Sequence, residues 1–258
     1  MSMRRHISSA TAAAALGIAL AGCVSSNPSR AADQNVQASA YNLQLGIAYL
    51  QQNNLATAKE KLERAVKENP KDPNVHNALA LLYERLAQPD DADKEYRTAL
   101  RLDPQNPEIA NNYGAYLCRS NRAEEGARRL LEVAKNPLYR TPEAAYTNAG
   151  VCLRSLHRDD EAETNLRRAL EIRPSFAEAA FQLGDLELQR GRLAEARTRV
   201  DSYLGTYPAT PDLLLLGVRI ARASGDRVTA ERYARRLRLD FPDSQQVRAL
   251  SEVSPNPG

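Results

Sequence analysis

The residues of this chain that could do chemistry are few and far apart. The sequence holds three Cys, at positions 23, 118 and 152, and three His, of which His76 and His157 lie well inside the chain. Neither His has Cys or carboxylate neighbours at a spacing typical of a zinc or iron site, so we expect both on helix surfaces. The sequence has no Gly-rich phosphate loop and no Gly-x-Ser-x-Gly turn. It therefore predicts no catalytic site, no metal site and no cofactor, and an enzyme is not expected.

Cys23 ends a segment that resembles an export signal. Two Arg near the start precede a largely apolar stretch at 10–21, which is too short to span a membrane as a helix. Residues 20–23, which read LAGC, are similar to the lipobox of bacterial lipoproteins, in which the Cys is acylated and becomes the first mature residue. We therefore expect a signal peptide at 1–22 and lipidation of Cys23. Because no Asp directly follows the Cys, the resemblance implies the periplasmic face of the outer membrane.

The composition favours an all-helical protein. Apolar residues make up 43% of the 258 residues and charged residues 26%, with no Trp and three Phe. Ala, Leu, Glu, Arg and Lys, which are strong helix formers, are abundant. Removing residues 1–22 takes away two Arg and no acid from the 35 basic and 32 acidic residues, leaving 33 against 32, and this balance argues against a nucleic-acid partner. Residues 23–38, the Cys and a polar stretch, are expected to form a flexible tether.

The rest of the chain repeats one unit of about 34 residues. A small residue recurs at spacings of 34, 34, 36, 34 and 33, at Gly46, Ala80, Gly114, Gly150, Gly184 and Gly217. A second small residue recurs at Ala58, Ala92, Gly126, Ala162, Ala196 and Ala230, and a Pro at Pro70, Pro104, Pro137, Pro174, Pro208 and Pro242. A large apolar residue follows the first small residue by three positions, except in the fifth unit, where Glu187 stands.

This pattern resembles the tetratricopeptide repeat, a helix-turn-helix unit in which small residues let two antiparallel helices approach and Pro ends the second helix. The resemblance implies an all-α, right-handed superhelical solenoid whose concave face, lined by the first helices, suits a peptide ligand. Two extra residues predict an irregular end to the third repeat, and the sequence does not settle the order of the C-terminal tail at 245–258. The six repeats are 39–72, 73–106, 107–142, 143–176, 177–210 and 211–244.

Cys118 and Cys152 fall on the first helices of the third and fourth repeats, which should be neighbours. Export would place them in an oxidising compartment, where a bridge is favoured. Such a bridge would close a loop of about 34 residues and stabilise the fold by roughly 3 to 4 kcal/mol. Two buried thiols are the alternative, because the two positions within the repeat differ by two.

The most discriminating motif is the string Asn-Asn-Tyr-Gly-Ala-Tyr-Leu-Cys at 111–118. Paired Asn inside a helix is unfavourable by propensity, so a generic repeat would not be expected to hold it. With the lipobox and six repeats, the string is similar to the type IV pilus biogenesis lipoprotein family known as PilF or PilW, over essentially the whole chain.

That resemblance implies a pilotin, an outer-membrane lipoprotein that binds subunits of the type IV pilus secretin. A pilotin promotes their outer-membrane localisation and multimer assembly, hence pilus biogenesis and twitching motility. The family also implies that the two inner cysteines pair, and no small-molecule substrate is expected. Other outer-membrane repeat lipoproteins share the anchor and the fold, so a peptidoglycan-hydrolase adaptor or an outer-membrane protein assembly subunit is the alternative.

Positions of the first helices that usually face the groove give the candidate partner-binding residues. They are Leu43, Ile47, Leu50, Asn77, Leu81, Glu84, Asn111 and Arg119. Chaperone-adaptor repeats hold a terminal carboxylate with Lys and Asn, but apolar residues stand at the corresponding places here. We therefore expect an apolar or strand-like secretin segment as the ligand. The alternative is that some of these side chains pack under a neighbouring helix.

Overall fold

The structure is a computed structural model that describes residues 28–252, and the side chains of 33–250 among them. The lipobox and Cys23 lie outside the described residues. The described part of the chain folds into thirteen α-helices and no strands. Six antiparallel pairs, one in each expected repeat, are followed by a single short helix. The bounds are α1 Pro28–Gln51, α2 Leu55–Glu68, α3 Pro73–Arg85, α4 Pro89–Leu102, α5 Pro107–Arg119, α6 Ala123–Ala134, α7 Pro142–Ser155, α8 Asp159–Ile172, α9 Ala177–Gln189, α10 Leu193–Thr206, α11 Pro211–Ala223, α12 Arg227–Asp240 and α13 Gln245–Glu252.

The recurring small residues mark where the two helices of a pair touch. A Cβ added at Gly46, Gly114 or Gly150 would lie 2.5, 2.8 or 2.7 Å from the Leu side chain of the partner helix. We call the first helix of each pair helix A and the second helix B. The turn between them repeats as well, because each contains one residue with positive φ at the same place. These residues are Asn53, Ala87, Asn121, His157, Gly191 and Gly225.

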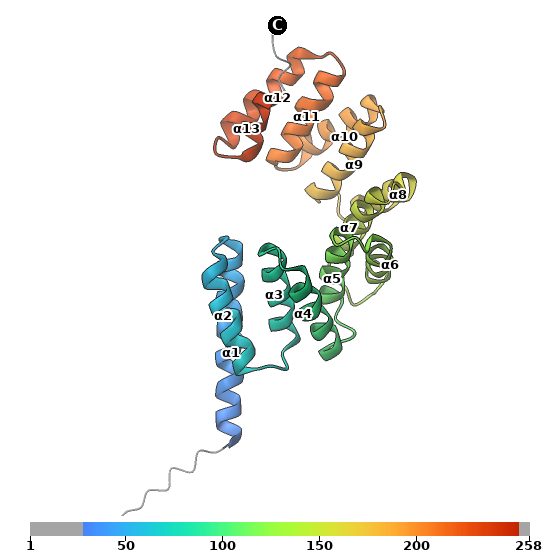
Figure 1. Ribbon diagram of the computed structural model, residues 1–258. Helices are drawn as coiled ribbons and strands as arrows, with labels where there is room; N and C mark the ends of the chain where they lie inside the picture. The colour runs from blue at the N-terminus through green and yellow to red at the C-terminus, as the bar shows by residue number, and fades with distance from the viewer. Residues whose placement is uncertain (1–27, 253–258) are drawn as a thin grey trace, which may run out of the picture.

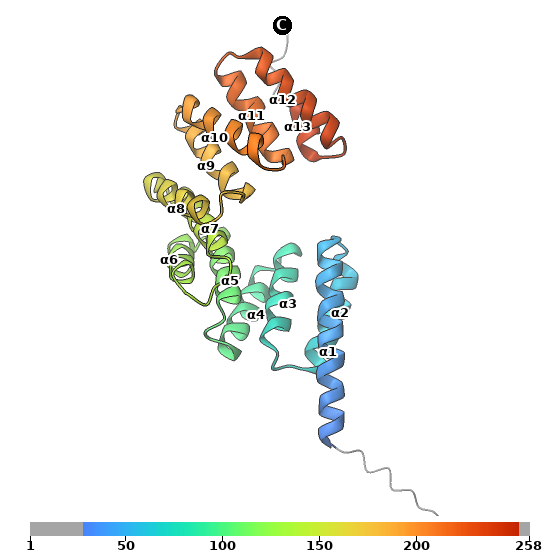
Figure 2. The same ribbon diagram turned by 180° about the vertical axis from the view of Figure 1, so that it is seen from behind.

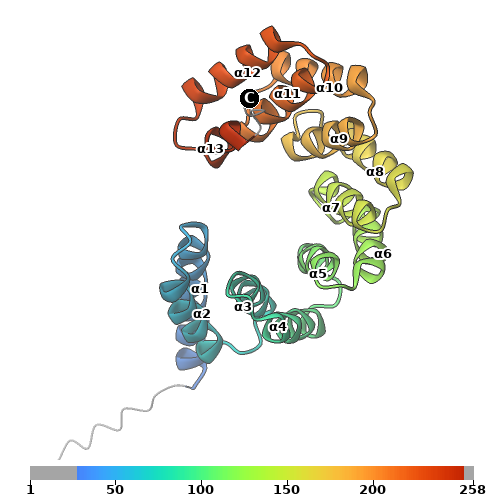
Figure 3. The ribbon, with the colours of Figure 1, turned by 45° about the horizontal axis from the view of Figure 1, so that its top comes forward.

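The pairs stack into a curved solenoid, as expected for a tetratricopeptide superhelix (Figures 1 and 2). Seen from the tilted direction of Figure 3, helices α3, α5, α7, α9 and α11 line the inner side of the curve. Helices α4, α6, α8, α10 and α12 form the outer side. The A helices therefore line the concave surface. Within the described range, none of the helices is both long and apolar enough to cross a bilayer.

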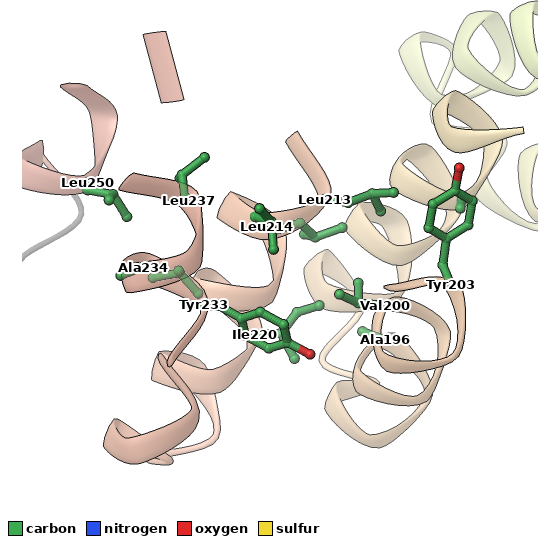
Figure 4. Packing of buried hydrophobic residues seen from close by; sticks show 13 residues of the cluster. Ala196, Val200, Tyr203, Leu213, Leu214, Ile220, Tyr233, Ala234, Leu237 and Leu250 are labelled. Carbon is green, nitrogen blue, oxygen red and sulfur yellow. The ribbon is translucent and has the colours of Figure 1, made fainter. Parts of the chain in front are cut away.

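Buried side chains form a series of clusters along the stack, so each repeat shares its core with the next. The C-terminal cluster joins α10, α11 and α12, and Leu250 of α13 closes it with 4% exposure (Figure 4). Residues 245–252 of the tail are therefore helical. This short helix covers the apolar side of the last repeat, where a seventh repeat would otherwise pack.

The expectation of a flexible tether at 23–38 is wrong from Pro28 onward, because α1 begins there. Pro suits the first turn of a helix, and the Ala and Gln that follow favour its continuation. The segment lacks an amphipathic period because it has no partner helix. Residues 33–37 are all exposed, and Ser39 is buried against α2, with its hydroxyl donating to Ala65 O at 2.9 Å.

The irregular end expected for the third repeat is present. Helix α6 ends at Ala134, and residues 135–141 form a loop before α7. Tyr139 points back into a small cluster with Val133 and Ala145 and is 7% exposed. The extra residues thus place an aromatic ring where the shortened helix would leave a gap.

Candidate partner-binding site

The inner surface of the first four A helices carries a row of uncharged side chains. Since successive helix residues are about 100° apart, the residue directly after the small residue points away from helix B. In repeats 1 to 4 this position holds Ile47, Leu81, Ala115 and Val151, which we call the inner row. Ile47 is 40% exposed and Val151 39%, while the other two are half-buried. The inner row is thus partly accessible apolar surface on the A helices, which line the concave side.

Two pairs of Asn link successive A helices beside the inner row. Asn112 of α5 donates its Nδ2–H to Oδ1 of Asn77 of α3 at 3.2 Å. Asn148 of α7 donates in the same way to Oδ1 of Asn111 of α5 at 3.1 Å. We call these the amide pairs. They explain why two adjacent Asn stand inside α5: one side chain bonds to the preceding repeat and the other to the following repeat.

The inner row ends at the fifth repeat, where its position is taken by Asp185. This carboxylate accepts hydrogen bonds from Arg154 of α7 at 2.7 Å and from Arg219 of α11 at 2.8 Å. Arg154 also donates to the Oε1 of Gln182 at 2.6 Å. Asp185 is 8% exposed, so a buried carboxylate that bridges three A helices replaces the apolar side chain of the inner row there.

The eight candidate groove residues have different fates in the structure. Leu50 is wrong as a groove residue, because it is 6% exposed and packs in the core of the first two repeats. Glu84 and Arg119 are not free for a ligand: they pair with each other at 2.6 Å, and Glu84 also accepts from the Tyr96 hydroxyl at 2.6 Å. These positions follow the small residue by four or five residues, about one turn beyond the inner row.

The remaining five candidates stay on or beside the concave face. Ile47 and Leu81 belong to the inner row, and Asn77 and Asn111 belong to the amide pairs. Leu43 is half-buried against the first core cluster. Asn112, Asn148 and Val151 were missed, although the adjacent Asn111 and the echo of the string in repeat 4 were signals that pointed to them.

The aromatic residues of the 111–118 string join the third repeat to the second. The rings of Tyr113 and Tyr116 each lie 5.4 Å from that of Tyr96, centroid to centroid. The Tyr113 hydroxyl donates to Asp93 at 2.9 Å and that of Tyr116 to Pro89 O at 2.7 Å. The string therefore packs the third repeat against the second.

Cys118 and Cys152 are bonded to each other in the structure, with their Cα atoms 5.3 Å apart. The Cys118 sulfur also explains an anomaly of the third repeat. A Cβ on Gly126 would lie 2.6 Å from this sulfur and 2.7 Å from Gly114 O, so the Ala found there in the other repeats would not fit.

A cluster of three carboxylates lies outside the concave face, between repeats 4 and 5. Glu163, Glu187 and Glu195 bring oxygens within 4.8 Å of one another, a spacing that a cation could use. Arginines supply the positive charge instead. Arg199 donates to both oxygens of the fully buried Glu187, at 2.9 and 2.7 Å. The departure at Glu187 was visible in the sequence, but its partners were not.

Glu163 is the most strongly perturbed acid of this cluster. Arg192 donates to it at 2.5 Å and Arg167 at 2.6 Å. The hydrogen bond from Arg192, with help from Arg167, holds the pKa of Glu163 at about 2, below its ordinary value. Glu163 is thus ionised at neutral pH, and the cluster is held by its ion pairs with Arg192 and Arg167.

The expectation that His76 lies on a helix surface is wrong. Its ring is 8% exposed, with Nδ1 2.6 Å from Glu95 and Nε2 2.9 Å from Pro70 O. The hydrogen bond with Glu95 raises the pKa of His76. Two acceptors on the two ring nitrogens hold α3, α4 and the turn before them together. His157, in contrast, is exposed in a turn.

Comparison with known proteins places this architecture in a family. Family models described as tetratricopeptide repeat match residues 43–107, 77–144 and 156–216. The type IV pilus assembly protein PilF of Pseudomonas aeruginosa is 32% identical over 232 residues, which cover 89% of this chain and 92% of PilF. The chain belongs to the PilF family of type IV pilus assembly proteins.

Solved structures of PilF-family proteins have the same fold. The structure of PilF from Pseudomonas aeruginosa matches with a TM-score of 0.67 and 29% identity, covering 86% of this chain and all of that one. The crystal structure of PilW, described as a widely conserved type IV pilus biogenesis factor, matches with a TM-score of 0.70 and 31% identity, covering 83% and 99%. The family expected from the repeats and the string is confirmed: the chain is a type IV pilus biogenesis protein on a tetratricopeptide scaffold.

Proposed function

We propose that this PilF-family chain is an outer-membrane lipoprotein adaptor, a pilotin. It binds subunits of the type IV pilus secretin on its concave face and promotes their outer-membrane localisation and assembly into a multimer. Family membership supports a role in pilus biogenesis. The LAGC sequence at 20–23 supports acylation of Cys23 and attachment to the periplasmic side of the outer membrane. With acylation and disulfide formation both following export, Cys118 and Cys152 are oxidised in the same compartment.

The observation that carries the binding role is the inner row. It presents apolar side chains from four successive A helices without a charge among them, on a chain in which 26% of residues are charged. A concave, uncharged surface of this length suits a peptide segment of another protein. Binding alone is sufficient for an adaptor, because delivery is supplied by the lipid anchor.

The start of α1 at Pro28 limits the distance between the proposed lipid anchor at Cys23 and the concave face. Cys23 and Pro28 are five residues apart, which corresponds to at most about 17 Å of extended chain. Helix α1 then runs for eleven residues before Ser39 makes its contact with α2, about 16 Å of helix. The concave face is therefore held at a short and limited distance from the membrane surface.

The pilotin role is tested by the secretin multimer itself. Membranes from cells with and without this protein are compared for SDS-resistant secretin multimers and for their fractionation with the outer membrane. Loss of multimers in the deletion strain, restored by the wild-type chain, supports the proposal. Normal outer-membrane multimers in the deletion strain contradict it and favour one of the other lipoprotein scaffolds. Cys23→Ala should remove the protein from the outer-membrane fraction, and unchanged fractionation contradicts the anchor.

The inner row is tested by charge insertion at matched exposure. Ile47→Glu and Val151→Glu place a carboxylate on the row, whereas Ile172→Glu places one at the end of helix B α8. The three wild-type side chains are 40%, 39% and 39% exposed, so the cost to folding should be similar. We expect reduced secretin multimers for the first two variants and normal multimers for the third. Equal losses in all three, tracking melting temperature, would contradict a binding role for the row.

A further inference from the structure

The amide pairs have hydrogen-bonding groups left over. In each pair one Nδ2–H···Oδ1 bond is made inside the protein. The Nδ2 groups of Asn77 and Asn111 and the Oδ1 atoms of Asn112 and Asn148 have no hydrogen-bond partner among the described residues. None of these atoms belongs to the described side-chain atoms that are both buried and unpartnered. Each pair therefore offers a donor and an acceptor to whatever enters the groove.

This combination is complementary to a peptide main chain. A main-chain unit carries one N–H and one C=O, and a carboxamide pair can satisfy both. A helical ligand already bonds these groups internally, so an extended segment uses the pairs and a helix does not. The neighbouring cations are engaged elsewhere, because Arg119 pairs with Glu84 and Arg154 with Asp185. Neither Arg119 nor Arg154 therefore offers an unpaired cation to a terminal carboxylate.

The spacing of the A helices fixes the length and register of such a segment. Packed helices lie about 10 Å apart, and an extended chain rises about 3.3 Å per residue. The two amide pairs are one repeat apart, or about three ligand residues. The four helices of the inner row span about nine ligand residues, whose side chains alternate between two faces.

We propose that the two amide pairs hold the main chain of an extended, uncharged partner segment of about nine residues, while alternate side chains of that segment pack on the inner row. This rests on the proposed function, because the segment is taken to belong to the secretin. Recognition then depends on backbone hydrogen bonds and on the absence of charge, and little on the individual side chains of the ligand.

The probe is a set of overlapping fifteen-residue peptides that cover the secretin sequence of the same organism. Their binding to the full-length protein in detergent micelles is measured by fluorescence anisotropy. The tightest peptide is then made again with a single N-methyl group at each residue in turn. An N-methyl group removes one main-chain donor and leaves the side chain in place.

Two protein variants remove one carboxamide each, Asn112→Leu and Asn148→Leu, with a side chain of similar size. Asn165→Leu is the matched control, because Asn165 is a half-buried residue of the outer helix α8 that donates to Glu161 O. Melting temperatures identify any variant that fails to fold. The decisive readout is coupling between the protein variant and the peptide N-methyl group, which a purely structural role of Asn would not produce.

We expect N-methylation to weaken binding about tenfold at positions roughly three residues apart, as the loss of one hydrogen bond would. Asn112→Leu should weaken binding to the same extent and abolish the effect of N-methylation at one of these positions. The control should match the wild type. Equal N-methyl effects in wild type and in both variants would overturn the inference, as would the absence of any binding peptide up to about 1 mM.

The multimer assay separates this inference from the proposed function. If the deletion strain loses secretin multimers but no peptide shows coupling, the pilotin role stands and the main-chain clamp is overturned. If multimers are normal in the deletion strain, the pilotin role fails and the inference fails with it.

Discussion

Two junctions of the solenoid hold equivalent helices together by different chemistry. The central junction, between repeats 3 and 4, uses the Cys118–Cys152 bond and the Asn111–Asn148 amide pair. The ionic junction, from repeat 4 to repeat 6, uses the buried Glu187 cluster and the Asp185 ion pairs. The inner row crosses the first and stops at the second. The uncharged row thus crosses the junction that is held by a disulfide and an amide pair, and it ends where the buried carboxylate of Asp185 takes its position.

The largest effect is expected from removing the covalent contact of the central junction. The double variant Cys118→Ala with Cys152→Ala should lower the free energy of unfolding by about 4 kcal/mol, the chain-entropy value for a loop of this length. Urea unfolding with and without reductant checks this. The wild type should lose stability on reduction, and the double variant should not respond.

An identical wild-type unfolding curve under both conditions would contradict the oxidised bridge. It would also remove the main difference between the two junctions, since both would then depend on non-covalent contacts alone.

The ionic junction should show an asymmetry between the two partners of its buried pair. Arg199→Leu leaves the fully buried Glu187 without its bidentate partner and should cost about 3 kcal/mol. Glu187→Leu restores the large apolar residue of the other repeats, and the freed Arg199 keeps 20% exposure, so we expect a change of less than about 1 kcal/mol. Urea unfolding of both variants is the measurement. If both variants lost the same free energy of unfolding, the ion pair itself, and not the unpaired buried charge, would account for the loss.

The sequence predicted the repeat architecture because its signal is local and recurs. At Gly46, Gly114, Gly150 and Gly217 the small residue of helix A faces a Leu or Tyr of helix B in the same repeat. The spacing of these residues therefore encodes helix pairing directly. The same reasoning placed Ile47 and Leu81 on the concave face, where the inner row lies.

The sequence could not predict contacts between different repeats. Glu84 and Arg119 are 35 positions apart, and their pairing depends on how steeply the superhelix curves. The burial of Leu50 against the second repeat depends on the same curvature. The start of α1 at Pro28 was missed for another reason: a helix without a partner has no apolar period to detect.

Gly126 provides a smaller test of the close approach between α5 and α6, the two helices of repeat 3, beside the central junction. Gly126→Ala places a methyl group 2.7 Å from Gly114 O and 2.9 Å from Cys118 N, both backbone atoms, so α5 and α6 must separate. We expect a loss of about 2 kcal/mol in thermal or urea unfolding. Gly205 of α10 is the matched control, because a Cβ there meets nothing within 4 Å.

Gly205→Ala should raise stability by about 0.5 kcal/mol, since Ala loses less backbone freedom than Gly in a helix. If both Ala substitutions changed the free energy of unfolding in the same direction, backbone freedom and not helix separation would account for the Gly126 result.

The acid dependence of the ionic junction can be tested through Glu163. The pKa of Glu163 is lowered to about 2, chiefly by Arg192, from an ordinary value of 4.5. A lowered pKa stabilises the fold above the ordinary value and loses this contribution as the pH falls through the lowered one. The Glu163 contribution should thus be complete above pH 4.5 and lost towards pH 2. Urea unfolding between these pH values should show a shallower pH dependence for Glu163→Gln, and the two curves should converge at the acid end. Parallel curves for variant and wild type would place the acid-sensitive group elsewhere, because the amide cannot titrate.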